Sequence, residues 1–257
     1  MIETKPFQLL SKKDSPALTV VNPAGRAPIC LVCEHASANI PRSLDELGLS
    51  AGDRYSHAVW DIAAENLARR LCEILDAPLV LGGVSRLVYD CNRPPERADA
   101  MPFRTEKIVI PGNRDISEIQ RSARVREVYD VFHAAVSAQI DSFSDHPVLV
   151  TVHSFTPLWH GERRTVEIGL LHDADPTLAQ CMQGAAEGEY RVELNVPYSA
   201  VDGVTHTLAR HGTARGLQNV MIEVRNDLLN TADETKNVAH ALQQMLHIAL
   251  SHKAHIE

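Results

Sequence analysis

Apolar residues follow two patterns that alternate along the chain. Short continuous runs rich in β-branched residues are typical of strands buried on both faces of a sheet, whereas apolar residues at every third or fourth position are typical of amphipathic helices. The runs predict strands over 29–33, 78–81, 87–89, 148–153, 166–171, 192–194 and 220–224. The periodic stretches predict helices over 44–47, 57–75, 116–143, 176–188, 208–216 and 233–252, and the first turn of the second of these would carry His57 and Asp61.

The alternation of strands and helices predicts an α/β fold, with a mixed but mostly parallel sheet flanked by helices on both faces. Residues 1–27 are polar, contain prolines and lack a sustained period, so we expect an extended lead-in on the surface. Residues 94–115 also lack a period, and such a long loop in a compact domain is more often functional or flexible than without a role. No stretch resembles a linker, so we expect one domain over 1–257.

Composition narrows the classes of function. Hydrophobic residues make up 44% of the chain and charged residues 23%, as in ordinary globular proteins. The formal net charge of -8 and the scattered Lys and Arg residues argue against nucleic acid as a partner. No window approaches the roughly 18 apolar residues of a membrane span, and the N-terminus has no signal-peptide pattern. We therefore expect a cytoplasmic protein that does not bind a membrane.

Cysteine usage gives no sign of a disulfide framework. The chain has five cysteines, an odd number, and no secretory context. Cys30 and Cys33 have the spacing of a redox or zinc motif, but the two residues between them are apolar and belong to a predicted strand. The context favours a buried structural role for both.

Polar side chains gather where four of the apolar runs end. The four clusters are Glu34-His35, Asn92-Arg93, His153-Ser154 and Glu223-Val224-Arg225. Taken singly, a histidine at a strand end is more often a hydrogen-bonded loop residue than a ligand. Because ligand sites in such sheets lie beyond the carboxyl ends of the strands, the coincidence of the four clusters favours a shared site.

The residue types in these clusters are those of a zinc hydrolase. Such enzymes use imidazole and carboxylate ligands, keep one coordination position for water, and need a carboxylate base. His35 and His153 are candidate ligands together with either Asp61 or Glu34, and Glu223 is the candidate base. The competing interpretation of Glu223 is a strand carboxylate paired with an arginine on the same face.

Two arginines are candidates for substrate binding, although both could be surface charges. The planar guanidinium groups of Arg86 and Arg93 suit a substrate carboxylate, and Asn92 adds a neutral donor. The remaining histidines on predicted helix faces are expected to have no role in the site. They include His133, His240, His247 and His252.

Six blocks in order resemble the N-formylglutamate amidohydrolase family, over about residues 30–229. They are CEHAS at 33–37 with Pro41, HAVWDI at 57–62, SRLVYDCNRP at 85–94, HSFTP at 153–157, NVPYS at 195–199 and IEVRNDL at 222–228. The family is similar in fold to the zinc carboxypeptidases. The resemblance implies that His153 is a zinc ligand and Glu223 the general base, and that Asn92 and Arg93 hold the substrate carboxylate. Tyr198 and Arg225, in the last two blocks, join Arg86 as candidates for substrate binding.

The metal motif matches the zinc carboxypeptidases less well in its first half. Those proteins have a glutamate three residues after the first histidine, whereas Ala38 stands three residues after His35. The resemblance implies that Asp61, after an insertion, supplies the carboxylate, with Glu34 as the alternative. The chain also has Glu-His-Ala-Ser where the well characterised branch resembles Pro-His-Ser-Gly, a change that affects substrate identity more than chemistry.

The sequence thus predicts a zinc-dependent amidohydrolase that cleaves the N-acyl amide, in particular the N-formyl amide, of an acidic amino acid such as N-formylglutamate. The expected partner is a small anionic N-acyl amino acid, and the expected cofactor is one divalent zinc ion. A metallocarboxypeptidase-like enzyme or another N-acyl amino acid hydrolase is the alternative among enzymes. A binding protein that keeps the pocket without turnover is the alternative from another class.

Overall fold

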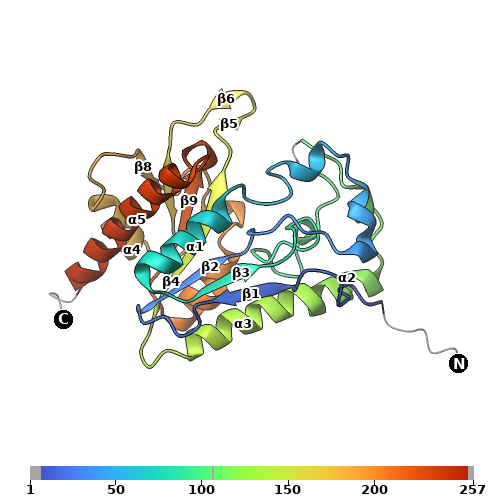
Figure 1. Ribbon diagram of the computed structural model, residues 1–257, viewed down its shortest axis with the longest axis horizontal. Coiled ribbons are helices and arrows are strands. Elements are labelled where there is room, and N and C mark those ends of the chain that lie inside the picture. Colours follow the sequence, from blue (N-terminus) through green and yellow to red (C-terminus); the bar gives the residue numbers. More distant parts are fainter. Residues whose placement is uncertain (1–6, 106, 254–257) are drawn as a thin grey trace, which may run out of the picture.

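A seven-stranded mixed sheet forms the centre of the protein (Figure 1). The computed structural model describes residues 7–105 and 107–253. The strands are β1 (Leu18–Val21), β2 (Ile29–Cys33), β3 (Leu79–Gly82), β4 (Val148–Phe155), β7 (Ile168–Leu171), β8 (Val192–Leu194) and β9 (Asn219–Arg225), in the order β1-β3-β2-β4-β9-β7-β8. Strands β3, β2, β4 and β9 are parallel to one another. Strand β1 pairs antiparallel with β3 and β7 pairs antiparallel with β9, while β8 is parallel to β7. The predicted α/β class is confirmed.

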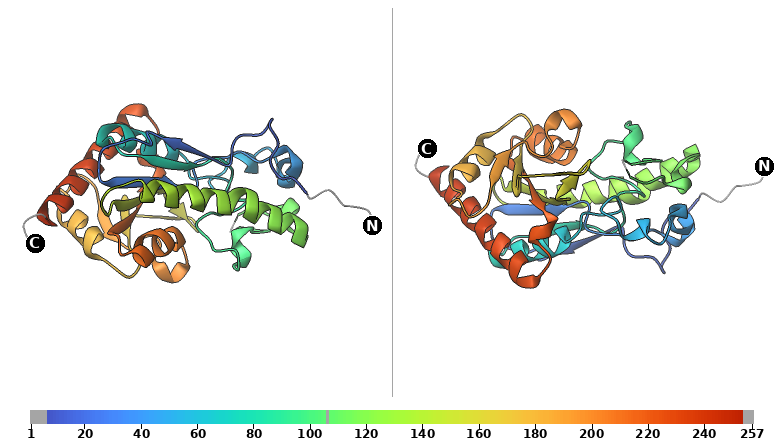
Figure 2. Two further views of the ribbon diagram at one scale, coloured as in Figure 1. Left: turned by 90° about the horizontal axis from the view of Figure 1, so that it is seen from below. Right: turned by 90° about the horizontal axis from the view of Figure 1, so that it is seen from above.

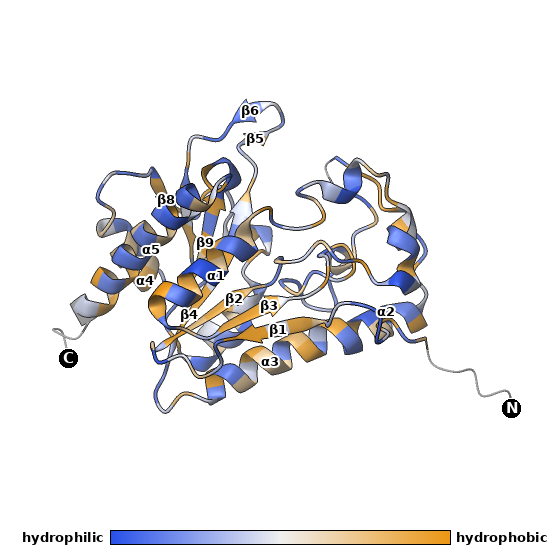
Figure 3. Ribbon diagram, viewed as in Figure 1, coloured by the Kyte–Doolittle hydropathy of each residue, from blue (hydrophilic) through white to orange (hydrophobic). Residues whose placement is uncertain are grey.

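Helices cover both faces of the sheet (Figure 2). They are α1 (Ala64–Leu75), α2 (Glu118–Arg124), α3 (Asp130–Asp141), α4 (Thr177–Gly184) and α5 (Ala232–Lys253). Helices α1, α4 and α5 pack on one face with Val150 and Val152 of β4, while α3 packs on the other face with Leu149. Inner strands such as β2 and β3 are buried from both sides, and they are almost uniformly apolar (Figure 3).

The long predicted helix over 116–143 is present as one continuous helical segment. Helix α2 begins after Ser117, whose hydroxyl caps the backbone N–H of Gln120 while the Gln120 side chain accepts from the Ser117 backbone N–H. A π-helical turn, Val125–Tyr129, joins α2 to α3. A second π-helical turn, Leu208–Gly212, occupies much of the helix predicted over 208–216.

Residues 87–89, predicted as a strand, instead form a buried turn. Their carbonyl groups bond to side chains instead of a neighbouring strand. The Asn113 amide donates to the Leu87 carbonyl at 2.7 Å, and the Arg124 guanidinium donates to the Val88 carbonyl at 3.1 Å. The prediction was wrong because burial makes such a turn as apolar as a strand.

The predicted surface lead-in over 1–27 is also partly wrong. Residues 18–21 form edge strand β1, and Leu9 is buried in the core. The backbone N–H groups of Leu9 and Leu10 donate to the Glu127 carboxylate, which holds this segment against the long helix. Residues 1–6 of the predicted lead-in lie outside the described residues.

Cys30 and Cys33 are both buried in β2 and face opposite sides of the sheet. Burial raises the pKa of the Cys30 thiol to about 12 and raises that of Cys33 as well. Both thiols are therefore protonated at neutral pH, which agrees with the predicted structural role. Within the described part of the chain, the helices are too short or too polar to cross a membrane.

Candidate metal centre

The parallel strands at the centre of the sheet bring the predicted residues to one edge. His35 follows β2, His153 lies near the end of β4, and Glu223 is the direct neighbour of His153 on β9. Asp61 was predicted in the first turn of a helix, but α1 begins only at Ala64, and Asp61 lies in the preceding loop. There its backbone N–H donates to the His35 carbonyl at 3.0 Å instead of forming a helical hydrogen bond. Residues far apart in the sequence therefore meet because their strands end together.

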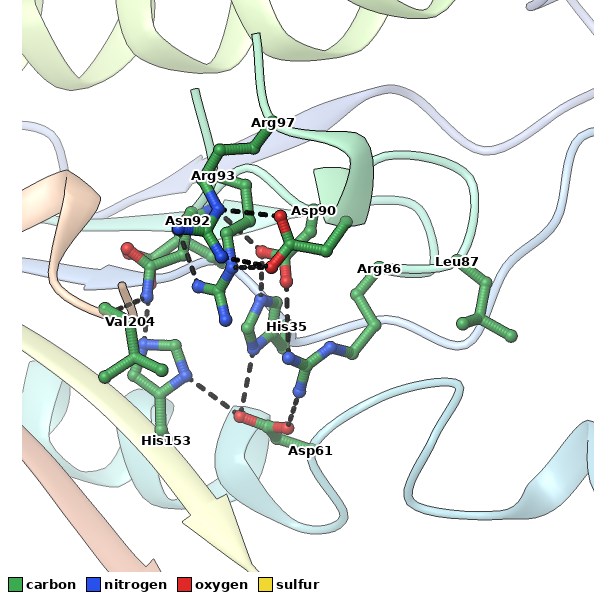
Figure 4. Close-up of polar contacts among 12 residues, drawn as sticks. His35, Asp61, Arg86, Leu87, Asp90, Asn92, Arg93, Arg97, His153 and Val204 are labelled. Carbon is green, nitrogen blue, oxygen red and sulfur yellow. Dashed lines mark hydrogen bonds and ion pairs between the residues drawn. The ribbon is translucent and has the colours of Figure 1, made fainter. Parts of the chain in front are cut away.

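His35, Asp61 and His153 point toward one another in this buried site (Figure 4). One Asp61 oxygen, Oδ2, lies 3.2 Å from His35 Nδ1 and 2.9 Å from His153 Nδ1. Of the residues that the structure describes, these three form the one group whose ligand atoms all lie within 4.8 Å of one another. Two imidazoles and a carboxylate in this arrangement fit a divalent cation, with zinc favoured by the nitrogen ligands.

The far ring nitrogen of each histidine faces another carboxylate. Asp90 Oδ1 lies 2.7 Å from His35 Nε2, and Glu34 Oε2 lies 3.1 Å from His153 Nε2. Carboxylates in such positions orient metal-binding histidines and raise their basicity. Because Glu34 lies beyond His153, away from the three converging atoms, the geometry favours Asp61 over Glu34 as the third donor.

The acids and histidines of the group stabilise one another's charged forms. Burial alone would lower the pKa of His153, but the Glu34 and Asp61 carboxylates outweigh it and raise that pKa. Burial would raise the pKa of Asp61, but His35, His153 and Arg86 together lower it. Asp61 is therefore ionised at neutral pH, as a metal ligand must be.

Glu223 is the one acid of the site whose pKa shifts upward. Burial raises the pKa of its carboxyl to about 7, and the nearby Asp61 carboxylate adds to that rise against His153, His35 and Arg86. Its Oε2 is buried without a hydrogen-bond partner among the described residues. A buried carboxyl oxygen with no partner is costly in a folded protein unless a ligand or reaction uses it.

A cavity of about 140 Å³ opens between these groups. It is lined by His35, His57, Asp61, Arg86, Asn92, Arg93, His153, Ser154, Tyr198, Val204 and Glu223. The structure thus gathers nearly all of the predicted site residues around one space. Two lie outside the lining: Glu34, described above, and Arg225, whose guanidinium bonds to Asp227 at 2.7 Å and Glu167 at 3.3 Å.

Three cavity residues predicted to bind substrate already have protein partners (Figure 4). Arg86 bonds to Asp61 at 3.1 Å and to Asp90 at 3.2 Å, so it bridges two acids of the site. Arg93 bonds to Asp99 at 3.1 Å. The Asn92 amide accepts from the Thr207 backbone N–H at 3.0 Å and donates to the Val204 carbonyl, which holds that loop over the cavity.

Sequence reasoning assigned no role to Asp90 or His57. The signal for Asp90 was present, because an acid that directly follows an apolar run is buried and needs a cationic partner. Its partner, His35, could not be identified without the fold. His57 lines the cavity, and its Nδ1 is buried without a hydrogen-bond partner among the described residues. Burial lowers the pKa of His57 to about 4, so its ring is neutral at pH 7.

The fold is an α/β sheet with a histidine and carboxylate site at the carboxyl ends of its parallel strands, which is where such sheets bind ligands. The chain matches the family model of N-formylglutamate amidohydrolase over residues 27–230. It therefore belongs to the N-formylglutamate amidohydrolase family, whose members are hydrolases acting on amide bonds. The predicted family is confirmed. No curated protein matches the chain.

Two solved structures have the same fold. A gene product of Agrobacterium tumefaciens is 46% identical, with a TM-score of 0.92, over 96% of this chain and 100% of that one. An N-formylglutamate amidohydrolase from Ralstonia eutropha JMP134 has the same fold, with a TM-score of 0.63 and 16% identity, over 93% of this chain and 99% of that one.

Proposed function

We propose that this protein is a zinc-dependent amidohydrolase that removes the N-formyl group from an acidic amino acid such as N-formylglutamate. One observation carries the proposal: His35, Asp61 and His153 converge beside Glu223, whose buried Oε2 has no partner among the described residues. Membership of the family supports amide hydrolysis. The donor set supports the metal, because catalytic zinc sites use three protein ligands of these types.

The metal ion and Glu223 have separate tasks in this proposal. His35, Asp61 and His153 would hold the zinc ion, which would supply Lewis-acid chemistry for an amide carbonyl and a water molecule. Glu223 faces the same cavity from the neighbouring strand. Its carboxylate takes a proton from the attacking water and delivers it to the leaving amine. Arg86 keeps Asp61 and Asp90 in place through its two hydrogen bonds.

The dimensions of the site favour a small acyl group. A cavity of about 140 Å³ is well below the roughly 300–1,000 Å³ of sites for drug-sized ligands. A formyl group fits such a space, and longer acyl chains need more room. Arg93 and Tyr198 line the same cavity and are the proposed contacts for the α-carboxylate of the amino acid.

Metal analysis combined with a substrate panel tests the proposal. Protein purified without added metal should contain about one zinc per chain and should hydrolyse N-formyl-L-glutamate faster than N-acetyl-L-glutamate or a peptide. Glu223→Gln should lower kcat by about 10²–10⁴-fold and leave the zinc content unchanged, because only the base is lost. Glu73→Gln, an exposed change on α1, is the matched control.

Four results would contradict this proposal. Protein without bound metal that also fails to gain activity with added zinc would favour a binding protein. Faster cleavage of a peptide would favour a carboxypeptidase-like enzyme, and faster cleavage of another acyl group would favour a different N-acyl hydrolase. A Glu223→Gln enzyme with the parent rate would remove Glu223 from the reaction.

A further inference from the structure

The arginines predicted to bind substrate carboxylates all form ion pairs with acids of the protein itself. Arg86 is paired with two acids, Arg93 with Asp99, and Arg225 with two acids outside the cavity. An arginine that already has a carboxylate partner gains less from a second one. A substrate with two carboxylates therefore needs another cation near the cavity.

Arg164 is such a cation. It follows β6 (Glu162–Arg163), and its guanidinium lies over three aromatic rings, 4.8 Å from the ring centre of Trp159, 5.1 Å from that of Tyr198 and 5.3 Å from that of Phe155. It donates to the Thr156 carbonyl and to the Tyr198 hydroxyl, each at 3.2 Å. Among the residues that the structure describes, no carboxylate lies within 4.0 Å of its nitrogens.

A groove beside the catalytic cavity places Arg164 next to the site. The groove has a volume of about 340 Å³ and is lined by Trp159, Glu162, Arg163, Arg164, Pro197, Tyr198 and Asp202. Tyr198 lines both the groove and the catalytic cavity, so the two spaces are neighbours.

The two acids of the groove leave room for a substrate anion at Arg164. Asp202 accepts from the Ser199 backbone N–H at 2.8 Å and stays bound to its own turn. Glu162 lies in the short hairpin formed by β5 (Leu158–Trp159) and β6, where it is the strand partner of Trp159. Neither carboxylate forms an ion pair with Arg164, although both border the same groove.

We propose that Arg164 is the residue that makes the enzyme specific for acidic amino acids, because it binds the side-chain carboxylate of the substrate in this groove. The inference rests on the proposed function and adds the residue that recognises the substrate side chain. Aromatic faces stabilise the guanidinium and fix its plane, so it is prepared for two parallel hydrogen bonds to a carboxylate. The neutral side-chain amide of glutamine offers a single acceptor oxygen and no charge, so its interaction with Arg164 is much weaker.

A pair of matched substrates tests the proposal. Arg164→Gln should lower kcat/KM for N-formyl-L-glutamate by about 30–100-fold, as expected for one charge-assisted pair. The same variant should change kcat/KM for N-formyl-L-glutamine by less than about threefold, so that the preference for the acid collapses. For N-formyl-L-glutamate, the kcat/KM of Arg164→Lys should lie between those of the parent and of Arg164→Gln, because lysine keeps the charge and loses the planar guanidinium group.

The control is Arg69→Gln, which removes the same charge from an exposed ion pair on α1 and should leave kcat/KM unchanged for both substrates. If Arg164→Gln lowers kcat/KM equally for both substrates, Arg164 only supports the fold of the groove. An unchanged preference for the acid would show that another residue recognises the side chain. Either result overturns the proposal.

A binding measurement separates this proposal from the proposed function. If the parent protein hydrolyses neither N-formyl substrate, the proposed function fails, and calorimetric titration with L-glutamate and L-glutamine then decides about Arg164. Tighter binding of glutamate, lost in Arg164→Gln, would support the carboxylate site. Equal or absent binding of the two amino acids by the parent protein would overturn it.

Discussion

Two clusters of buried histidines lie in this protein, and their surroundings differ. In the metal centre, His35 and His153 have ring centres 4.8 Å apart, and carboxylates face both nitrogens of each ring. In the second cluster, His133 and His211 are stacked with ring centres 5.0 Å apart. His133 Nδ1 lies 2.7 Å from His211 Nε2, and His133 Nε2 donates to the Cys91 carbonyl at 2.9 Å.

The difference shows that the carboxylates, more than the histidines, give the candidate metal centre its charge. Burial lowers the pKa of His133 to about 3 and that of His211 to about 4, and no acid counters the effect strongly. In the metal centre, Glu34 and Asp61 outweigh the same burial and raise the pKa of His153. The second cluster is thus neutral and structural, whereas the first one is a centre of charge.

The largest effect should come from removing the shared carboxylate. Asp61→Asn keeps the size of the side chain and removes its charge, so the two histidines lose the anion that joins them. We expect most of the bound zinc to be lost and kcat/KM to fall by at least about 10³-fold. Metal analysis and steady-state rates measure both. Asp141→Asn, at an exposed ion pair with Arg215, is the control, and an Asp61→Asn protein with full zinc would exclude Asp61 as a ligand.

A smaller effect should follow when the carboxylates behind the histidines are neutralised. Asp90→Asn and Glu34→Gln each leave the three donor atoms in place and weaken the orientation of one ring. Zinc affinity should fall by about 10–100-fold in each variant. Competition with a chelator measures the dissociation constant. Parent affinity in both variants would mean that these acids only satisfy buried nitrogens.

The smallest effect should come from the second cluster, whose two histidines should make the stability of the protein depend on pH. The folded protein holds His133 and His211 at a pKa below the usual 6.5, so the unfolded chain binds more protons between about pH 4 and 6.5. Stability should therefore fall as the pH is lowered through that range, by up to about 1.4 kcal/mol per pH unit for each histidine.

Urea unfolding of the zinc-loaded protein at several pH values tests this expectation. His211→Gln should reduce the pH slope, while zinc content and kcat/KM stay at the parent level because the residue lies outside the metal centre. His240→Gln, on the exposed side of α5, should leave the slope unchanged. A loss of zinc in His211→Gln would show that the two clusters are coupled.

The sequence predicted the central strands and the candidate ligands for a common physical reason. Strands β2, β4 and β9 are buried on both faces, so they read as continuous apolar runs, and the polar residues at their ends stand out. Parallel strands end at the same edge, which is why His35, His153 and Glu223 could be placed together before any coordinates were known.

Contacts made by long side chains could not be predicted in this way. Alternation put Glu223 and Arg225 on one face of β9, but the long Arg225 side chain extends to Glu167 and Asp227, away from the cavity. Arg164 stands in a polar stretch of exposed hairpin, and only the fold brings three aromatic rings to it. Such partners depend on tertiary structure, about which spacing along the chain carries no information.

The position of β9 late in the chain has a consequence for the order in which the residues of the site are synthesised. His35, Asp61 and His153 are all synthesised before Glu223, and β2 pairs directly with β4. At about 5–20 residues per second, the ribosome needs roughly 4–14 s to proceed from His153 to Glu223. We expect a nascent chain to acquire its metal ligands before its base, so that metal loading can precede the ability to cleave a substrate.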